Sequence, residues 1–225
     1  MLKKLNNVSD AKEFIKGYGM CTLLKTSLLP ELSLEYNQPE RLWATDNNLW
    51  EWKKDIVRER KCLYGRIFNN KIGFIRKDLA KDLINYRRDG YDFDSLINST
   101  TVSEIDIMIY NTILKHKVLS AKSLRRMCSV SKETSKEFEK ALNRLQMETY
   151  ICVSSFEYEI DKNGDFYGWG TTYYSTPELL FGEKFIEKAY EYDPSESYSR
   201  LIKHLKKTVP DHDDKELIKF IKYSR

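Results

Sequence analysis

The clearest pattern of hydrophobic and polar positions lies in the second half of the chain. Apolar residues recur at helical spacing over 103–116 and again over 131–147, after a tight turn in which Ser131 is placed to cap the longer helix. Between these two helices, Val118-Leu119 predicts a short extended bridge and Ser120 caps a short helix. The apolar stripe of the longer helix consists of Phe138, Ala141, Leu142 and Leu145.

Two strands follow this helix. Residues 150–160 and 165–175 are rich in aromatic and β-branched residues, and Asn163-Gly164 lies between them. Asn-Gly favours a tight hairpin turn because both residues accept a positive φ. The order helix, bridge, helix, turn, helix, hairpin is typical of a winged helix-turn-helix, so we expect that fold over residues 102–175.

The first half of the chain gives a similar but weaker pattern. We expect a helix over 9–17, capped by Ser9 or Asp10, and another over about 48–59 with Leu49, Trp52, Lys53 and Ile56 on one side. Residues 62–67 and 72–75 predict a hairpin around Asn69-Asn70, and a helix follows over 77–87 with Gly90 suited to its end. Residues 18–38 show no clear period and predict no element.

Helices are expected again after the second hairpin, where Thr176-Pro177-Glu178 and Asp193-Pro194 are typical helix starts. The chain therefore divides into a degenerate winged-helix-like module over 1–98, a winged helix-turn-helix over 99–176, and C-terminal helices over 177–225 that we expect to pack on the hairpin. The predicted fold class is α+β and mostly helical, in a tandem winged helix-turn-helix architecture.

Composition narrows the class of protein. The 225 residues are 41% hydrophobic and 32% charged, with a net charge of +4, which is ordinary for a globular protein and only mildly basic. The four cysteines and three histidines are dispersed, so we expect buried thiols, no metal site and no cofactor. No apolar run is long enough for a membrane span or a signal sequence, which favours a cytoplasmic protein without a membrane partner.

The helix over 131–147 is the candidate recognition helix. The face opposite its apolar stripe carries the residue types that contact phosphates and base edges in DNA: Lys132, Ser135, Lys136, Lys140 and Asn143. Glu133, Glu137 and Glu139 lie among them, and the same mixture is also typical of a solvated helix stabilised by ion pairs. Double-stranded DNA and a bare scaffold role are therefore both open.

Aromatic residues of the second hairpin are a further candidate contact. Alternation places Tyr167, Trp169 and Tyr173 on one face, which suits stacking on a base or packing against the C-terminal helices. The arginines and carboxylates near residue 90 are candidates for acid-base chemistry or phosphate binding, or for ion pairs and helix caps. They are Arg87, Arg88, Asp89, Asp92 and Asp94, with Tyr91 as a further candidate in the same run.

Several short motifs together resemble a known bacterial family. They are Trp50-Glu51-Trp52-Lys53, Tyr64-Gly65-Arg66, the run 85–94, Leu145-Gln146-Met147-Glu148-Thr149-Tyr150, Tyr167-Gly168-Trp169 and Ser175-Thr176-Pro177-Glu178. In these motifs the chain resembles the AlkZ-related bacterial proteins, short relatives of the AlkZ/YcaQ crosslink-repair DNA glycosylases. The resemblance to the short group extends over nearly the whole chain, whereas that to the glycosylases is mainly one of fold.

The resemblance implies tandem winged helix-turn-helix modules around a DNA-binding cleft. The glycosylases position their catalytic water with a Gln-x-Gln motif, and here the only glutamines, Gln38 and Gln146, are far apart. This absence favours a first hypothesis, a DNA-binding protein without catalysis. A second is a nucleic-acid enzyme with altered catalytic residues, among them Arg87, Arg88 and Asp92, and a third is a winged helix that binds a protein partner.

Overall fold

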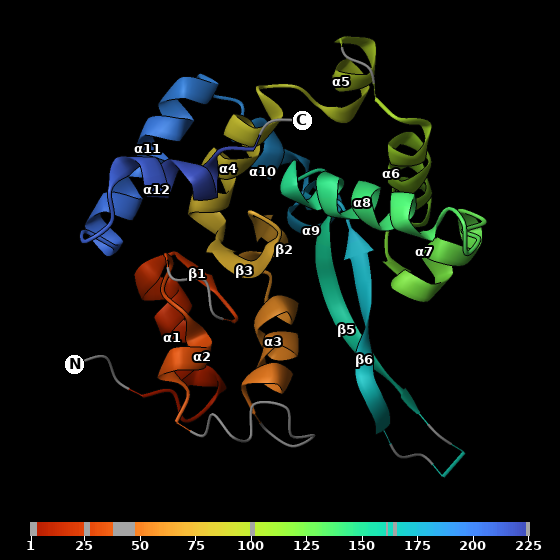
Figure 1. Ribbon diagram of the computed structural model, residues 1–225, viewed down its shortest axis with the longest axis horizontal. Coiled ribbons are helices and arrows are strands. Elements are labelled where there is room, and N and C mark those ends of the chain that lie inside the picture. The colour runs from red at the N-terminus through yellow and green to blue at the C-terminus, as the bar shows by residue number, and fades with distance from the viewer. Residues whose placement is uncertain are drawn as a thin grey trace.

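The computed structural model describes residues 4–24, 28–37, 48–99, 102–160, 162–163 and 166–223 (Figure 1). The chain begins with α1 (Val8–Tyr18), β1 (Met20–Thr22), α2 (Leu32–Glu35), α3 (Leu49–Arg58), β2 (Cys62–Phe68), β3 (Lys71–Arg76), α4 (Lys77–Arg88) and α5 (Phe93–Ser99). It continues with α6 (Glu104–His116), β4 (Leu119–Ser120), α7 (Ala121–Met127), α8 (Ser135–Met147), β5 (Cys152–Ile160) and β6 (Phe166–Ser175). It ends with α9 (Pro177–Phe181), α10 (Glu183–Glu187), α11 (Pro194–Thr208) and α12 (Asp214–Ile221).

The same topology occurs twice in this α+β chain. A first unit, α1 to β3, and a second unit, α6 to β6, each run helix, strand, helix, helix, strand, strand. Each unit has a small antiparallel sheet with the first strand against the third, in the orders β1-β3-β2 and β4-β6-β5. The repeat extends into residues 18–38, where the sequence predicts no element and the structure has β1 and α2.

Side-chain caps fix where most of the helices begin. The side chain of Asn48 accepts hydrogen bonds from two backbone N–H groups of α3. That of Asn7 accepts one, from the Asp10 N–H, and caps α1, where Ser9 or Asp10 was expected. The predicted cap at Ser131 is wrong: α8 begins at Ser135, because residues 132–134 form a turn that precedes it. In that turn, the Ser131 N–H donates to the Thr134 hydroxyl oxygen at 3.0 Å.

Both predicted hairpins are confirmed. In the first, Asn69 and Asn70 take the left-handed conformation that a tight turn requires, with φ of 46° and 62°. In the second, β5 and β6 pair from Cys152↔Ser175 to Ile160↔Phe166. Gly164 of its turn lies outside the described residues, whereas the neighbouring Asn163 is described and exposed.

The two units contact each other reciprocally. Helix α3 of the first unit packs on β5 of the second, α8 of the second packs on β2 of the first, and β2 also contacts β5. At the α8 contact, the side-chain oxygen of Gln146 accepts a hydrogen bond from the Arg66 N–H at 3.1 Å. Gly65 permits this approach, since a Cβ atom there would lie 3.1 Å from the same oxygen.

The C-terminal helices cover the first unit. Helix α11 packs along α4, and α12 packs on α11, so their apolar residues join the core of β2, β3 and α4 (Figure 1). From the sequence we expect the C-terminal helices to pack on the second hairpin. The stripe of α11, with Leu201 and Leu205 fully buried, instead faces the apolar side of α4 around Leu83.

Candidate nucleic-acid interface

The buried face of α8 fixes which side chains the helix presents outward. Its predicted stripe is confirmed, because Phe138, Ala141, Leu142 and Leu145 all lie in one core with residues of α6 and α7. Residues three or four apart share a helix face. The opposite face therefore contains Lys136, Lys140, Asn143 and Met147.

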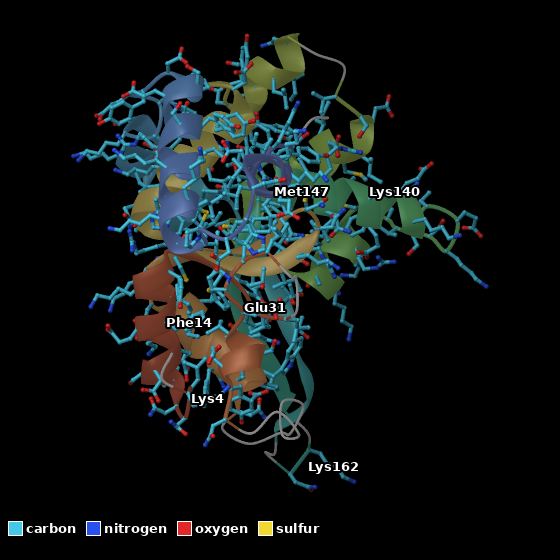
Figure 2. All side chains as sticks on the ribbon, turned by 60° about the vertical axis from the view of Figure 1, so that its left-hand side comes forward. Lys4, Phe14, Glu31, Lys140, Met147 and Lys162 are labelled. Carbon is cyan, nitrogen blue, oxygen red and sulfur yellow. The ribbon has the colours of Figure 1, made fainter. Side chains whose placement is uncertain are left out.

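This outward face is open at one end and covered at the other. Lys136 and Lys140 are exposed and Asn143 is half-buried, whereas Met147 is only 5% exposed. Figure 2 shows Lys140 on the part of the helix that projects from the molecule, with Met147 near its packed centre. The first unit covers the far end, so only the N-terminal part of α8 has room for a ligand.

Two of the three glutamates near this face have hydrogen-bond partners of their own. Glu139 forms an ion pair with Arg125 of α7, at 2.6 Å. The Ser131 hydroxyl donates to Glu133 at 2.5 Å, and this hydrogen bond lowers the pKa of the Glu133 carboxyl. The Arg125 cation therefore reduces the repulsion that Glu139 would exert on a phosphate, whereas Glu133 keeps its negative charge.

The other residues predicted on this surface differ in their exposure and in their hydrogen-bond partners. Ser135 is half-buried, and its hydroxyl accepts a hydrogen bond from Arg125 at 2.8 Å, so it already has a partner within the protein. Lys132 is exposed in the turn before α8. The side chains of Tyr167 and Trp169 lie outside what the structure describes, so the base-stacking hypothesis for them stays a prediction.

Arg87 connects four parts of the chain. Its buried guanidinium donates hydrogen bonds to backbone carbonyls of Ile67, Met147, Phe220 and Ile221. Burial lowers the pKa of Arg87 to about 10. The guanidinium therefore holds β2, α8 and α12 together from the end of α4.

Arg88 has a comparable role at the second unit. It forms a 2.5 Å ion pair with Glu178 of α9 and donates to the Thr149 carbonyl at 2.7 Å and the Tyr190 hydroxyl at 3.1 Å. Burial alone would lower the pKa of Arg88, but Glu178 and Tyr190 raise it above its ordinary value. Both arginines are thus occupied by contacts within the fold.

The remaining residues of this segment lie in the turn after α4. Asp89 takes the left-handed conformation at the end of α4, with φ of 51°. Asp92 accepts a hydrogen bond from the Ser95 N–H at 2.7 Å, which caps α5. Hydrogen bonds from the Ser95 side chain and backbone together lower the pKa of the Asp92 carboxyl. Tyr91 is exposed, and its carbonyl accepts from the hydroxyls of Tyr150 and Tyr190. This turn is thus stabilised by local caps and by backbone contacts.

A pocket of about 200 Å³ lies where the two units meet. Its walls come from α3, β2, β3, α8, β5 and β6, and include Trp50, Lys53, Arg66, Gln146 and Phe156. Lys53 lies on the buried side of α3, as the helical pattern predicts, and its side-chain nitrogen is 3.0 Å from the centre of the Trp50 ring. The pocket is not predicted from the sequence pattern, because its walls belong to two separate units.

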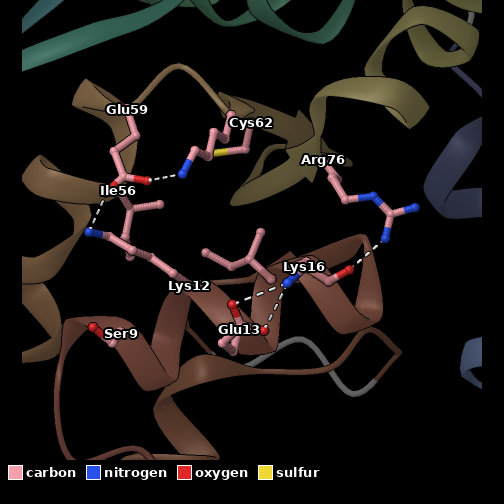
Figure 3. A pocket seen from close by; sticks show the side chains of 10 residues that line it. Ser9, Lys12, Glu13, Lys16, Ile56, Glu59, Cys62 and Arg76 are labelled. Carbon is pink, nitrogen blue, oxygen red and sulfur yellow. Dashed lines mark hydrogen bonds and ion pairs between the residues drawn. The ribbon is translucent and has the colours of Figure 1, made fainter.

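A larger groove of about 580 Å³ lies between α1, α3 and the ends of β2 and β3 (Figure 3). Its basic side chains already have partners within the protein: Lys12 pairs with Glu59 at 2.6 Å, and Arg76 pairs with Asp78 and donates to the Lys16 carbonyl. Figure 3 shows the pairing of Lys12 with Glu59 and the contact of Arg76 with the Lys16 carbonyl. The groove therefore offers little uncompensated positive charge for an anion.

The described ranges contain no disulfide, no cluster of metal ligands and no helix that could span a membrane. All four cysteines are free and buried, as expected. Among the described residues, no three or more histidine, cysteine, aspartate or glutamate side chains gather closely enough to hold a metal ion. Within the same ranges, no helix combines the length and apolar character that crossing a bilayer requires.

Comparison with known proteins identifies one family. The model of a family described as AlkZ related matches residues 5–222, which is nearly the whole chain. The chain matches no curated protein and no solved structure.

Proposed function

The chain belongs to the AlkZ-related family, and from that premise we propose that it binds duplex DNA through tandem winged helix-turn-helix modules, without acting as a glycosylase. The repeated topology supports this architecture. In both units, two helices follow the first strand and precede a hairpin, so α3 and α8 occupy the position of the recognition helix.

The single observation that carries the proposal is the open outward face of α8. The equivalent helix α3 packs against β5 of the second unit, with Trp52 and Lys53 buried. Its exposed residues, Asp55 and Arg58, carry opposite charges, so its open side offers no net positive charge to a groove of DNA. The N-terminal part of α8 is exposed, and its outward face carries Lys136, Lys140 and Asn143. The second unit therefore supplies the recognition helix.

The side chains of this surface fall into groups that contact different parts of the DNA. Lys132, Lys136 and Lys140 contact phosphates, and this contact does not depend on sequence. Asn143 is the side chain on this face that is suited to a base edge, where an amide pairs with adenine. Tyr167 and Trp169 of the second hairpin remain our candidates for a contact in the adjoining groove.

Fluorescence anisotropy with a labelled duplex over a series of salt concentrations tests this proposal. The wild type should bind with an affinity that falls steeply with salt. Replacement of Lys132, Lys136 and Lys140 by alanine should reduce the slope of log K against log salt by about three units, or about one for each lysine. The triple variant should weaken binding to every duplex sequence to a similar extent.

The matched control is Lys219→Ala. Lys219 is exposed on α12, which lies on the opposite side of the molecule from α7 (Figure 1), so its loss should leave the slope unchanged. Two results would refute the proposal: no salt-dependent binding by the wild type at low ionic strength, or equal binding by the triple variant. In the second case, Lys219→Ala shows whether the contact lies on the other side of the molecule.

A further inference from the structure

The pocket between the two units has room for one small ring. Its volume is about 200 Å³, and a protein cavity of roughly 150 Å³ holds a benzene molecule. Trp50 and Phe156 contribute aromatic walls, while Arg66, which is exposed, lies on its rim. A five-membered sugar ring, or its open-chain form, is of the size that fits.

Lys53 lines this pocket with an unusual set of contacts. The residue is only 3% exposed, and its side-chain nitrogen lies over two ring faces, 3.0 Å from the Trp50 centroid and 4.7 Å from the Phe156 centroid. Within the part of the chain that the structure describes, this nitrogen forms no hydrogen bond and no ion pair. The nitrogen is not one of the fully buried polar atoms that lack a partner, so it is accessible from the pocket that it lines.

We propose that Lys53 is a nucleophile that forms an imine with the aldehyde of a small sugar in this pocket, and that the sugar is the ring-opened deoxyribose of an abasic site in DNA. The choice of DNA as the source of the aldehyde rests on the proposed function. The reactivity of the Lys53 amine toward an aldehyde is independent of that function.

The step balances without an oxidant or a metal. The lone pair of the neutral Lys53 amine forms a bond to the aldehyde carbon as the C=O π bond breaks, and one proton moves from the nitrogen to the oxygen to give a neutral carbinolamine. The hydroxyl group then takes one proton from solvent and leaves as water, and the nitrogen lone pair forms the C=N bond of a protonated imine. Its positive charge lies at the position of the Lys53 side-chain nitrogen, over the Trp50 and Phe156 rings, and aromatic faces stabilise a cation there.

The surroundings of Lys53 favour the neutral amine that this step needs. Burial lowers the pKa of Lys53 to about 7, against an opposing effect of Glu51, whose carboxylate accepts a hydrogen bond from the Tyr158 hydroxyl. An exposed lysine has a pKa of about 10.4, so at pH 7 Lys53 has a neutral fraction roughly a thousandfold larger.

DNA bound on α8 would pass close to this pocket. Gln146 lines the pocket and lies one helical turn after Asn143, at the end of the open part of α8. Arg66 on the rim of the pocket supplies a positive charge for the phosphate next to an abasic sugar. A flipped abasic sugar carries no base, so it needs less room than a complete nucleotide.

Reductive trapping tests the proposal. The full-length protein is incubated with cyanoborohydride and one of three probes: a duplex with one abasic site, the matched intact duplex, or free 2-deoxyribose 5-phosphate. Peptide mass spectrometry then locates any adduct. We expect modification at Lys53 with the abasic duplex and with the free sugar, and none with the intact duplex.

Two variants separate the amine from its neighbours. Lys53→Met removes the amine and retains the length of the side chain, so it should abolish the adduct at this position without a new adduct elsewhere in α3. Lys54→Met removes the adjacent lysine, which lies 5.0 Å from the Tyr158 ring, and should leave trapping unchanged. Circular dichroism confirms that each variant is folded.

Three outcomes would overturn the proposal: adducts spread evenly over exposed lysines, equal trapping by Lys53→Met, or no adduct with either aldehyde. Trapping of the free sugar without the abasic duplex would overturn the assignment to DNA. The anisotropy series with intact duplex is measured separately, so a failure of DNA binding is distinguished from a failure of the amine chemistry.

Discussion

The backbone N–H of Asn70 donates a hydrogen bond to the sulfur of Met147, 2.9 Å away. The turn of the first hairpin thus contacts the last residue of α8. Met147 lies on the same helix face as Lys136 and Lys140, so the first unit covers the end of the face whose other end is open. The contact between the units therefore decides how much of α8 is available to a ligand.

The guanidinium of Arg87 stabilises this junction, and its loss should destabilise the whole chain. Arg87→Ala leaves buried carbonyls of Ile67, Met147 and Ile221 without a donor. A buried acceptor without its partner costs about 1–3 kcal/mol. We therefore expect the free energy of unfolding in urea to fall by at least about 3 kcal/mol.

Two variants serve as controls for this prediction. Arg87→Lys should recover only part of the stability, because an ammonium cannot donate to several carbonyls in the planar, forked geometry of a guanidinium. Arg126→Ala removes an exposed arginine of α7 and should change the free energy of unfolding by less than about 0.5 kcal/mol. Equal stability of Arg87→Ala and Arg126→Ala would contradict a structural role for Arg87.

The elements that could be predicted from sequence are those whose signal is local. The stripe of α8 and the hairpin around Asn163 follow from spacing and turn chemistry within a few residues. The three residues of β1 and the four of α2 are too short for a period to be recognised. Their place depends on pairing with β3 and on packing in the core of the first unit.

The candidate site was only partly predictable, for the same physical reason. The lysines of α8 follow from its helical periodicity alone. The pairing of Ser135 with Arg125, the cover over Met147 and the pocket around Lys53 arise from contacts between elements distant in sequence. A lysine on the apolar side of an amphipathic helix was the one local sign of that pocket.

The stability of the protein should depend on pH through Lys53. Burial places the pKa of Lys53 at about 7, below the value of 10.5 for an unperturbed lysine. Between these values the unfolded chain carries the extra proton, so stability rises with pH across this window and is lost as pH falls toward 7. The slope is about 1.4 kcal/mol for each pH unit.

Urea unfolding of the wild type and Lys53→Met at pH 7.5 and 9.5 checks this expectation. Other groups titrate equally in both proteins, so the difference between the two free energies isolates Lys53. The wild type should gain roughly 2–3 kcal/mol relative to the variant over this interval. Parallel pH profiles for the two proteins would show that the amine keeps its proton in the fold.

Arg125 should affect DNA binding through its ion pair with Glu139. Arg125→Met leaves the Glu139 carboxylate unpaired beside the lysines of α8 and should weaken duplex binding. An exposed pair is worth up to about 1 kcal/mol, which corresponds to a change of up to about fivefold in Kd. Adding Glu139→Gln should restore part of the loss, measured by the same anisotropy titration.

The affinity of the double variant relative to Arg125→Met shows how Arg125 affects DNA binding. If Arg125 contacts DNA directly and not through Glu139, the double variant should bind as weakly as Arg125→Met. If α8 does not contact DNA, neither Arg125→Met nor the double variant should differ from the wild type. Only recovery in the double variant agrees with an ion pair that reduces repulsion of phosphate.

The protein should not release bases from alkylated DNA. Hydrolysis of an N-glycosidic bond needs a water held at the sugar, and the related glycosylases hold it with two glutamines of one Gln-x-Gln motif. Here Gln146 is only 3% exposed, its oxygen accepts from the Arg66 N–H, and its nitrogen donates to the Leu142 carbonyl at 3.3 Å. Gln38 lies outside the described residues and far away in sequence. One misplaced positioning group can cost about a hundredfold in rate.

Incubation with duplex DNA that contains N7-alkylated guanine, followed by a test for abasic sites, checks this prediction. We expect no abasic sites above background in wild type, and none in Gln146→Ala. An aspartate could replace the missing glutamines, as carboxylates do in glycoside hydrolysis, and Asp89, Asp92 and Asp94 are the candidates. Asp92 already caps α5 through the Ser95 N–H, which gives it a structural role. Abasic sites that disappear in Asp89→Asn or Asp92→Asn would refute the prediction and place an enzyme active site in the turn after α4.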